Sequence, residues 1–221
     1  MHRHAYAKGQ ALPWEGRPQR ADLVCAVAIL LYSAYSIALI PAIPRLVGRH
    51  PVLLELMSGT PPAQVTAGAL ARVGGTSLLV AFAAGLIGTM MFDPLFWWAG
   101  RRWGRRGAAM LVGRGERAHR LIERGERIGE RWGALAVVLA YYLPIPNVLI
   151  YALVGWTGMR LVTFVALDLV GAALWTGLMV GLGYAIGQDA VDVAHAISHY
   201  SLLVTVALFA AIFARQFWRR G

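Results

Sequence analysis

Apolar residues follow one another in long runs along most of the chain. Residues 23–44, 73–92 and 132–159 contain no charged side chain, the run 161–187 contains one, and a last run covers roughly 200–214. About 20 apolar residues in a helix cross the hydrocarbon core of a bilayer. The pattern therefore predicts an all-α integral membrane protein with about four transmembrane helices.

The run at 139–159 is interrupted by two closely spaced prolines, Pro144 and Pro146. Proline lacks an amide hydrogen and clashes with the preceding helical turn, so the helix should break at about 143–147. Broken backbone at membrane depth persists only where protein or a water-filled cavity satisfies its polar groups, and such breaks mark substrate or ion sites. We expect a re-entrant helical hairpin here.

A second proline pair, Pro41 and Pro44, ends the first apolar run, and IPAIPRL at 40–46 echoes LPIPNVL at 143–149. Proline-interrupted segments in both halves of a chain are typical of inverted-repeat transporters. Residues 45–72 mix charges with turn signals, so we expect a second re-entrant hairpin there.

Asp93 and Pro94 directly follow the run at 73–92. Aspartate caps helix starts and proline favours the first helical position, so the pair predicts that a new helix begins there.

Charge changes the picture in two ways. Apolar residues make up 58% and charged residues only 14% of the chain, which excludes an ordinary soluble domain. The formal net charge of +10 is concentrated at 101–131, where arginines and glutamates lie three or four residues apart. This spacing predicts an amphipathic cytoplasmic helix or helix pair at the lipid surface. Nucleic-acid binding is not needed to explain these arginines.

Arginine placement also predicts the topology. The positive-inside rule puts the basic segments 1–22, 101–131 and 215–221 in the cytoplasm. The membrane halves 23–100 and 132–214 must then each cross an even number of times, which leaves two crossings and one re-entrant segment in each. The two hairpins would enter from opposite sides, as in an inverted repeat.

Three acidic residues are candidates for proton coupling, because carboxyl groups in membrane segments are costly and usually functional. Asp168 lies in an otherwise apolar run, Asp93 is either a proton carrier or a helix cap, and Glu55 is either intramembrane or at the outer surface. Arg45 is a phosphate ligand, the ion-pair partner of Glu55 or an interface residue. Asp168 is alternatively paired with an arginine.

Enzyme signatures are missing from the sequence. It has no glycine-rich phosphate loop, nucleophile elbow or His-Glu-x-x-His pair, and its lone Cys25 rules out a cysteine-based metal site. We expect neither enzymatic activity, nor a metal site, nor a bound cofactor.

The chain from about 75 to 190 resembles the DedA family of bacterial membrane proteins, which share the VTT domain. The residues that carry the resemblance are Asp93, Trp97, Gly100, Arg101, Pro144, Gly155, Met159, Phe164, Gly171, Trp175, Gly183, Tyr184 and Gly187. The chain departs from the family pattern at Tyr141 and Asn147, where the family has arginines, and at Asp168, where it has asparagine. The family's early Pro-x-Glu motif has no secure counterpart, and Arg45 and Glu55 lie near its place.

The resemblance implies two facing re-entrant hairpins in the bacterial inner membrane, and transport of polyprenyl phosphate or phospholipid that is proton-linked in some members. Arginine binds phosphate in a bidentate geometry that Tyr and Asn cannot reproduce. Neutral donors could remain at the site. The substrate-binding candidates are therefore Arg45, Arg101, Tyr141, Tyr142, Pro144 and Asn147.

Three functions stay open from the sequence: coupled transport of a phosphorylated lipid, passive lipid scrambling, and a non-transporting assembly subunit. The two lost arginines keep the third alternative open. Glycines 85, 88, 181 and 183 form small-residue faces, which suit helix packing within one chain or between two copies.

Overall fold

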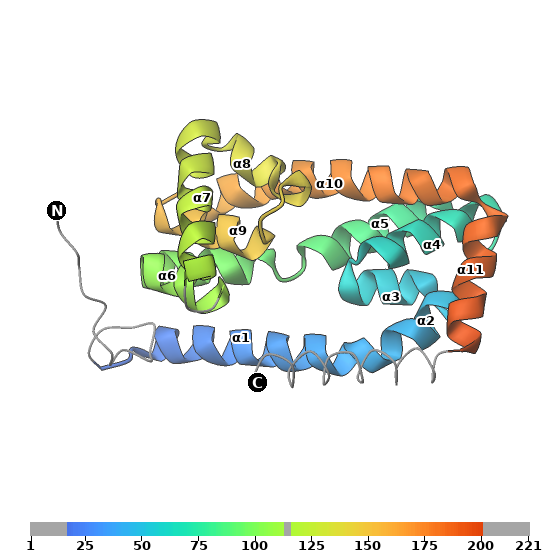
Figure 1. Ribbon diagram of the computed structural model, residues 1–221, viewed down its shortest axis with the longest axis horizontal. Helices are drawn as coiled ribbons and strands as arrows, with labels where there is room; N and C mark the ends of the chain where they lie inside the picture. The colour runs from blue at the N-terminus through green and yellow to red at the C-terminus, as the bar shows by residue number, and fades with distance from the viewer. Residues whose placement is uncertain (1–16, 113–115, 201–221) are drawn as a thin grey trace. The chain divides into compact units, whose positions relative to one another are not determined.

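A computed structural model describes residues 17–112 and 116–200 (Figure 1). All regular structure in these residues is helical, so the predicted all-α fold is confirmed. The helices in chain order are α1 (Arg20–Leu39), η1 (Ile40–Ala42), α2 (Ile43–Arg49), α3 (Pro51–Ser58), α4 (Pro61–Arg72), α5 (Leu78–Met90), α6 (Asp93–Val112), α7 (Glu116–Trp132), α8 (Leu135–Val138), η2 (Ala140–Tyr142), α9 (Asn147–Trp156), α10 (Leu161–Ile186) and α11 (Gln188–His199).

Three helical stretches are long and apolar enough to cross a membrane: Arg20–Arg49, Leu78–Gly104 and Leu161–Ile186. Large aliphatic side chains along them are exposed, among them Leu31 at 65% and Val162 at 80%. Aliphatic surface of this extent suits lipid rather than water. The fourth predicted span, roughly 200–214, and the tail 215–221 fall outside the described residues, as does most of segment 1–22.

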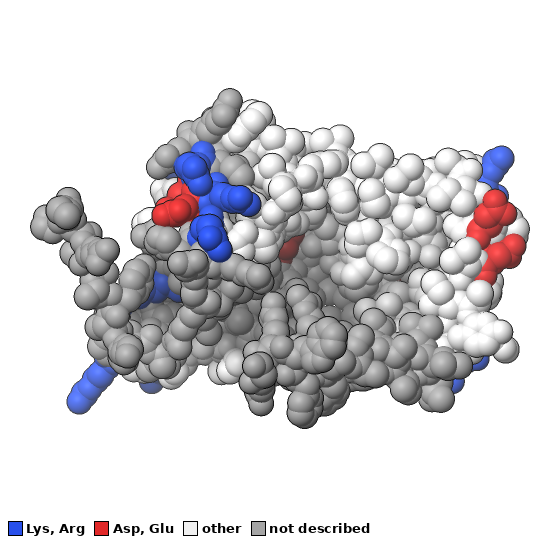
Figure 2. Space-filling view, in the orientation of Figure 1, with Lys and Arg blue, Asp and Glu red and all other residues white. Residues whose placement is uncertain are grey.

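The arginine-rich segment forms the predicted helix pair, α6 and α7. On α7, the side chain of Ile122 is buried while Arg120, Arg124 and Arg127 are exposed, so the helix is amphipathic. Figure 2 shows charged side chains over α7 and α11, whereas the surface drawn over α10 is uncharged. This distribution agrees with α10 as a lipid-embedded helix.

The described chain forms two compact units. The first contains the chain up to Leu30 together with Asp93–Asp168, and the second contains Leu31–Phe92 together with the chain from Leu169 onward. Asp93 and Asp168 belong to the first unit and Glu55 to the second, so each unit carries buried carboxyl groups of its own.

In the first unit, α6 and α9 pack through glycine. A Cβ on Gly100 of α6 would collide with the carbonyl of Ala152, and a Cβ on Gly155 of α9 would collide with the carbonyl of Trp97. Small residues let helix backbones approach closely, which is a main source of helix association in membranes. This close crossing holds the site residues of α6 and α9 near one another.

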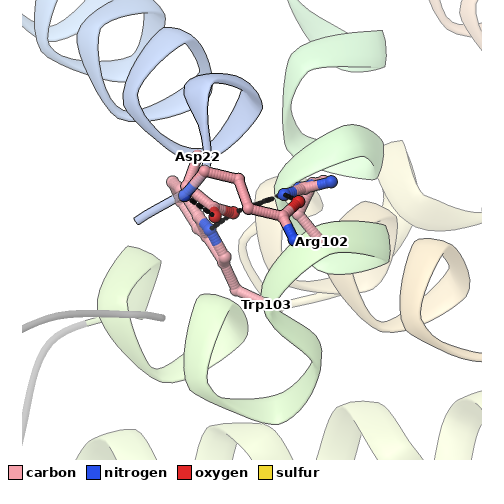
Figure 3. A network of polar contacts seen from close by, with 4 residues as sticks. Asp22, Arg102 and Trp103 are labelled. Atoms are coloured by element: carbon pink, nitrogen blue, oxygen red, sulfur yellow. Dashed lines mark hydrogen bonds and ion pairs between the residues drawn. The ribbon is translucent and has the colours of Figure 1, made fainter. Parts of the chain in front are cut away.

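A polar network anchors the start of α1 to α6 (Figure 3). Buried Asp22 accepts hydrogen bonds from Arg102 Nε at 3.1 Å and Nη2 at 2.9 Å, from the Trp103 indole at 3.0 Å and from the Gln19 amide at 3.0 Å. Next to this network, Cys25 and Ile29 of α1 pack against Ala99 and Trp103 of α6. Trp103 takes part in both the polar network and the apolar cluster. The carboxylate therefore satisfies donors of α6 and of Gln19, the residue directly before α1.

Asp22→Asn is expected to lower the unfolding temperature of the protein. Asparagine removes the charge that strengthens both Arg102 bonds to Oδ1, and its amide NH2 replaces the Oδ2 that accepts from the Gln19 amide, so we expect a cost on the order of 1–3 kcal/mol. Thermal unfolding in detergent measures the change, with Asp189→Asn on the exposed face of α11 as the matched control. Equal unfolding temperatures for Asp22→Asn and the wild type would show that the network does not stabilise the fold.

In the second unit, α3 and α4 form a helical hairpin within the predicted segment 45–72. Gly59 closes α3 in the left-handed region (φ 56°), and Thr60 in extended backbone leads into α4, which opens on two prolines. A glycine with positive φ commonly ends a helix, and proline is tolerated at a helix start. The predicted segment thus contains two helices joined by a tight turn, while their re-entry into the membrane and the inverted repeat stay predictions.

The two proline pairs behave differently. At Pro144 and Pro146 the helix stops as predicted, and the chain is non-helical between η2 and α9. A break at Pro41 and Pro44 is wrong, because the chain remains helical through both. Each proline opens a short helical segment, η1 or α2, where its missing amide hydrogen is not needed. The chain turns at His50 instead.

Candidate functional site

Two acidic side chains meet at one tyrosine in the first unit. Asp93 opens α6, Tyr141 lies in η2 directly before the proline break, and Asp168 lies in the first part of α10. The Tyr141 hydroxyl lies 2.9 Å from Asp93 Oδ2 and 3.0 Å from Asp168 Oδ1. Asp93 is 9% exposed and Asp168 is fully buried. Three segments far apart in sequence thus form one site.

The number of hydrogens at this site determines what it can do. A phenol has one hydrogen to donate, whereas both carboxyl oxygens lie at hydrogen-bond distance from it. Tyr141 can donate to one carboxylate, and the second bond then needs a hydrogen on the other carboxyl group, with the phenol oxygen accepting. A proton shared between like charges also avoids two adjacent buried carboxylates. The geometry therefore suits a site that holds and exchanges a proton.

Aromatic side chains enclose the two acids. The ring of Tyr151 meets the rings of Tyr141 and Phe164 edge to face, with centroid separations of 6.4 and 5.2 Å. Trp97 stacks on Phe164 at 6.3 Å. Tyr151 is fully buried, and its hydroxyl interacts electrostatically with the carboxyl groups of Asp93 and Asp168. Rings that exclude water lower the local dielectric, which increases the cost of an uncompensated charge.

Tyr151 is a site residue that the sequence analysis missed. It lies in the apolar run after the break, one turn beyond Asn147. The sequence feature that could have indicated Tyr151 is a tyrosine within an uncharged membrane segment, because a buried tyrosine hydroxyl usually has a polar neighbour. The Tyr151 hydroxyl interacts with Asp168 and therefore belongs to the same site.

The other predicted substrate-binding residues lie around the first unit's site or outside it. Tyr142 and Pro144 are exposed, and Asn147 is half-buried at the start of α9. Arg101 is exposed, and its guanidinium lies beside Gly158, just after α9. Arg45 belongs to the second unit and is exposed.

Two ion pairs considered from the sequence are wrong for the described residues. Glu55 has no hydrogen-bond partner on either carboxyl oxygen and forms no salt bridge with Arg45. Asp168 pairs with Tyr141 rather than with an arginine. Glu55 is fully buried whereas Arg45 is exposed, and this difference in burial explains why the two do not meet.

A second polar cluster, which the sequence did not predict, lies in the second unit. Gln64 Nε2 donates to Thr89 Oγ1 at 2.8 Å and to Thr176 Oγ1 at 3.3 Å. Glu55 Oε1 packs against Gly85, and Thr176 packs against the same glycine. Threonine and glutamine in apolar helices carry no periodic signal, so only the fold reveals that they meet.

The family model of the VTT domain matches residues 60–185. The chain belongs to the VTT domain family, the domain of the DedA proteins. No curated protein matches the chain, and no solved structure matches it. The predicted resemblance is thereby confirmed, and this VTT-domain protein is a membrane protein of the DedA type.

The VTT match covers the whole Asp93–Tyr141–Asp168 site, and Gln64, Thr89 and Thr176 as well. Arg45 and Glu55 precede it. All three residues of the acid–tyrosine site therefore lie within the matched domain, although Tyr141 and Asp168 are positions at which this chain departs from the family pattern. The second unit's cluster combines domain residues with one acid from outside the match.

Proposed function

We propose that this VTT-domain protein moves a phosphorylated lipid, a polyprenyl phosphate or a phospholipid, across the bacterial inner membrane in a proton-coupled cycle. Its N- and C-termini are cytoplasmic in this proposal, which follows the arginine distribution. The observation that carries it is the pair of buried carboxyl groups sharing the Tyr141 hydroxyl. Buried acids in membrane proteins serve proton relays and ion pathways.

Electrostatic repulsion between the lipid headgroup and the two carboxyl groups would couple lipid binding to proton uptake. An anionic headgroup that approaches Asp93 and Asp168 meets negative charge in a water-poor site, and like charges disfavour one another there. Protonation of the carboxyl pair removes this repulsion, so headgroup binding and proton uptake favour each other. By linkage the effect is reciprocal: a bound anion strengthens proton binding as much as the proton strengthens anion binding.

Donors in the same unit are available to the headgroup. Arg101 lies on α6 with Asp93, its guanidinium is exposed, and guanidinium binds phosphate in a bidentate geometry. Asn147 follows the proline break and offers a neutral donor where the family pattern has an arginine, whereas the Tyr141 hydroxyl is already shared by the two acids. Neutral donors bind phosphate more weakly than arginine does, so in this proposal Arg101 contributes most of the binding free energy for the headgroup.

Transbilayer movement in proteoliposomes tests the proposal. Fluorescent phospholipid and a labelled polyprenyl phosphate are reconstituted with the full chain, with and without an imposed pH gradient. We expect the gradient to accelerate movement of at least one lipid by more than about tenfold, which corresponds to about 1.4 kcal/mol in the barrier. Movement that is fast and indifferent to the gradient would identify a passive scramblase. No movement of either lipid by folded protein would favour an assembly subunit.

A further inference from the structure

Four helices of the second unit bring oxygen atoms to one buried place. Glu55 comes from α3, Gln64 from α4, Thr89 from α5 and Thr176 from α10. Glu55, Gln64 and Thr176 are each 0% exposed. We infer that these four side chains form a binding site for an alkali-metal cation. The inference goes beyond lipid movement and rests on residues other than the Asp93–Tyr141–Asp168 site.

Three acceptor atoms of this cluster are left without a partner. Gln64 uses its amide nitrogen on the two threonine hydroxyls, and its Oε1 has no hydrogen-bond partner among the described residues. The same holds for Glu55 Oε1 and Oε2. Leaving a buried acceptor unpaired costs about 1–3 kcal/mol, and more where the group is charged. The three buried acceptors belong to one polar cluster, and a positively charged ligand would satisfy them.

A glycine shapes the cluster. A Cβ built on Gly85 would collide with Glu55 Oε1 and would lie 2.7 Å from Thr176 Cγ2. Glu55 and Thr176 therefore flank the same bare stretch of α5. The backbone of α3 is held equally close, because a Cβ on Gly88 would collide with the Glu55 carbonyl. Glu55 is thus packed closely against α5 through both its carboxyl group and its backbone.

A metal cation satisfies these oxygens better than a proton does. A proton on Glu55 turns one carboxyl oxygen into a donor, which can reach one other acceptor and still leaves the third oxygen unpaired. A cation is coordinated by several oxygens at once, and the carboxylate, amide and hydroxyl oxygens form the all-oxygen ligand set that hard cations prefer.

The charge balance indicates a monovalent ion. Glu55 supplies one negative charge, and no other acidic side chain joins it within the described residues, which contain no cluster of three metal-binding groups. A monovalent cation leaves the site neutral, whereas a divalent ion leaves a buried positive charge that is costly inside a membrane protein. The bound ion would tie the α3–α4 hairpin to α5 and α10.

Equilibrium binding of radioactive Na⁺ to the purified full-length protein in detergent tests the inference. Choline replaces Na⁺ at constant ionic strength, and circular dichroism verifies the fold of every variant. We expect saturable Na⁺ binding that weakens by more than about tenfold in Glu55→Gln, which keeps the shape and removes the charge. Gly85→Ala should weaken it similarly, because the added methyl displaces the carboxyl group.

Two controls separate the site from its surroundings. Ser58→Ala changes a hydroxyl on the same helix that donates to the Leu54 carbonyl, and it should bind Na⁺ as the wild type does. Asp168→Asn changes the site proposed for proton coupling and should bind Na⁺ with wild-type affinity. The Na⁺-binding result is therefore independent of whether the proposed lipid transport is correct. Folded wild-type protein that binds no Na⁺ above the choline background would overturn the inference, as would unchanged affinity in Glu55→Gln.

Discussion

Asp168→Asn is expected to abolish the acceleration of lipid movement by a pH gradient while leaving the fold intact. Asparagine has nearly the same shape and can still pair with the Tyr141 hydroxyl, which lies 3.0 Å away. It cannot exchange a proton, so headgroup binding is no longer linked to proton uptake. We expect the gradient-dependent rate to fall by more than about tenfold, with any passive component retained.

Tyr141→Phe tests the same site from its centre. It removes the hydroxyl between Asp93 and Asp168 and leaves the ring against Tyr151. Two buried acids then lose their shared partner, and we expect gradient dependence to weaken without vanishing, since both acids still titrate. The matched control is Tyr142→Phe, because Tyr142 is the exposed neighbour. Equal losses in the two phenylalanine variants would contradict a specific role for the Tyr141 hydroxyl.

Gly183→Ala is expected to destabilise the second unit strongly. A Cβ at Gly183 of α10 would collide with the Val65 carbonyl of α4, and Gly68 of α4 meets the Val180 carbonyl of α10 in the same way. The obstacle is backbone, which cannot rotate aside, so the helices must separate. Overpacking of this kind costs about 1–3 kcal/mol, occasionally more.

The chain provides a close control two residues earlier. A Cβ at Gly181 on the same helix meets no atom within 4 Å. Gly181→Ala should therefore be neutral or slightly stabilising, because alanine favours helix by about 1 kcal/mol over glycine. Thermal unfolding of the two variants in detergent compares them. An unfolding temperature for Gly183→Ala as high as that for Gly181→Ala would show that the α4–α10 crossing is looser than described.

Helix starts and stops that depend on local backbone geometry could be predicted from the sequence. The stop at Pro144 and Pro146 and the helix start at Asp93 and Pro94 follow from the covalent geometry of proline, which acts within a few residues. Run length likewise predicted α10. The error at Pro41 and Pro44 has the same origin, since proline breaks a helix interior but not a helix start, and the sequence did not show that short helices begin there.

The hydrogen-bond partners within each polar cluster could not be predicted from the sequence. Asp93 and Asp168 were singled out because acids are costly in apolar runs, and the structure brings both to one place. That Tyr141 joins them depends on how η2 is placed after a break, which no periodicity encodes. Gln64 and Thr176 are 112 positions apart, and only helix packing reveals their contact.

Proton movement that accompanies lipid movement is the most direct test of the acid–tyrosine site. A pH-sensitive dye trapped inside proteoliposomes reports protons while polyprenyl phosphate or phospholipid is added to the outer leaflet. The proposed coupling predicts a pH change that requires both lipid and protein and is lost in Asp168→Asn. Lipid that crosses with no accompanying pH change, or a pH change that persists in Asp168→Asn, would contradict it.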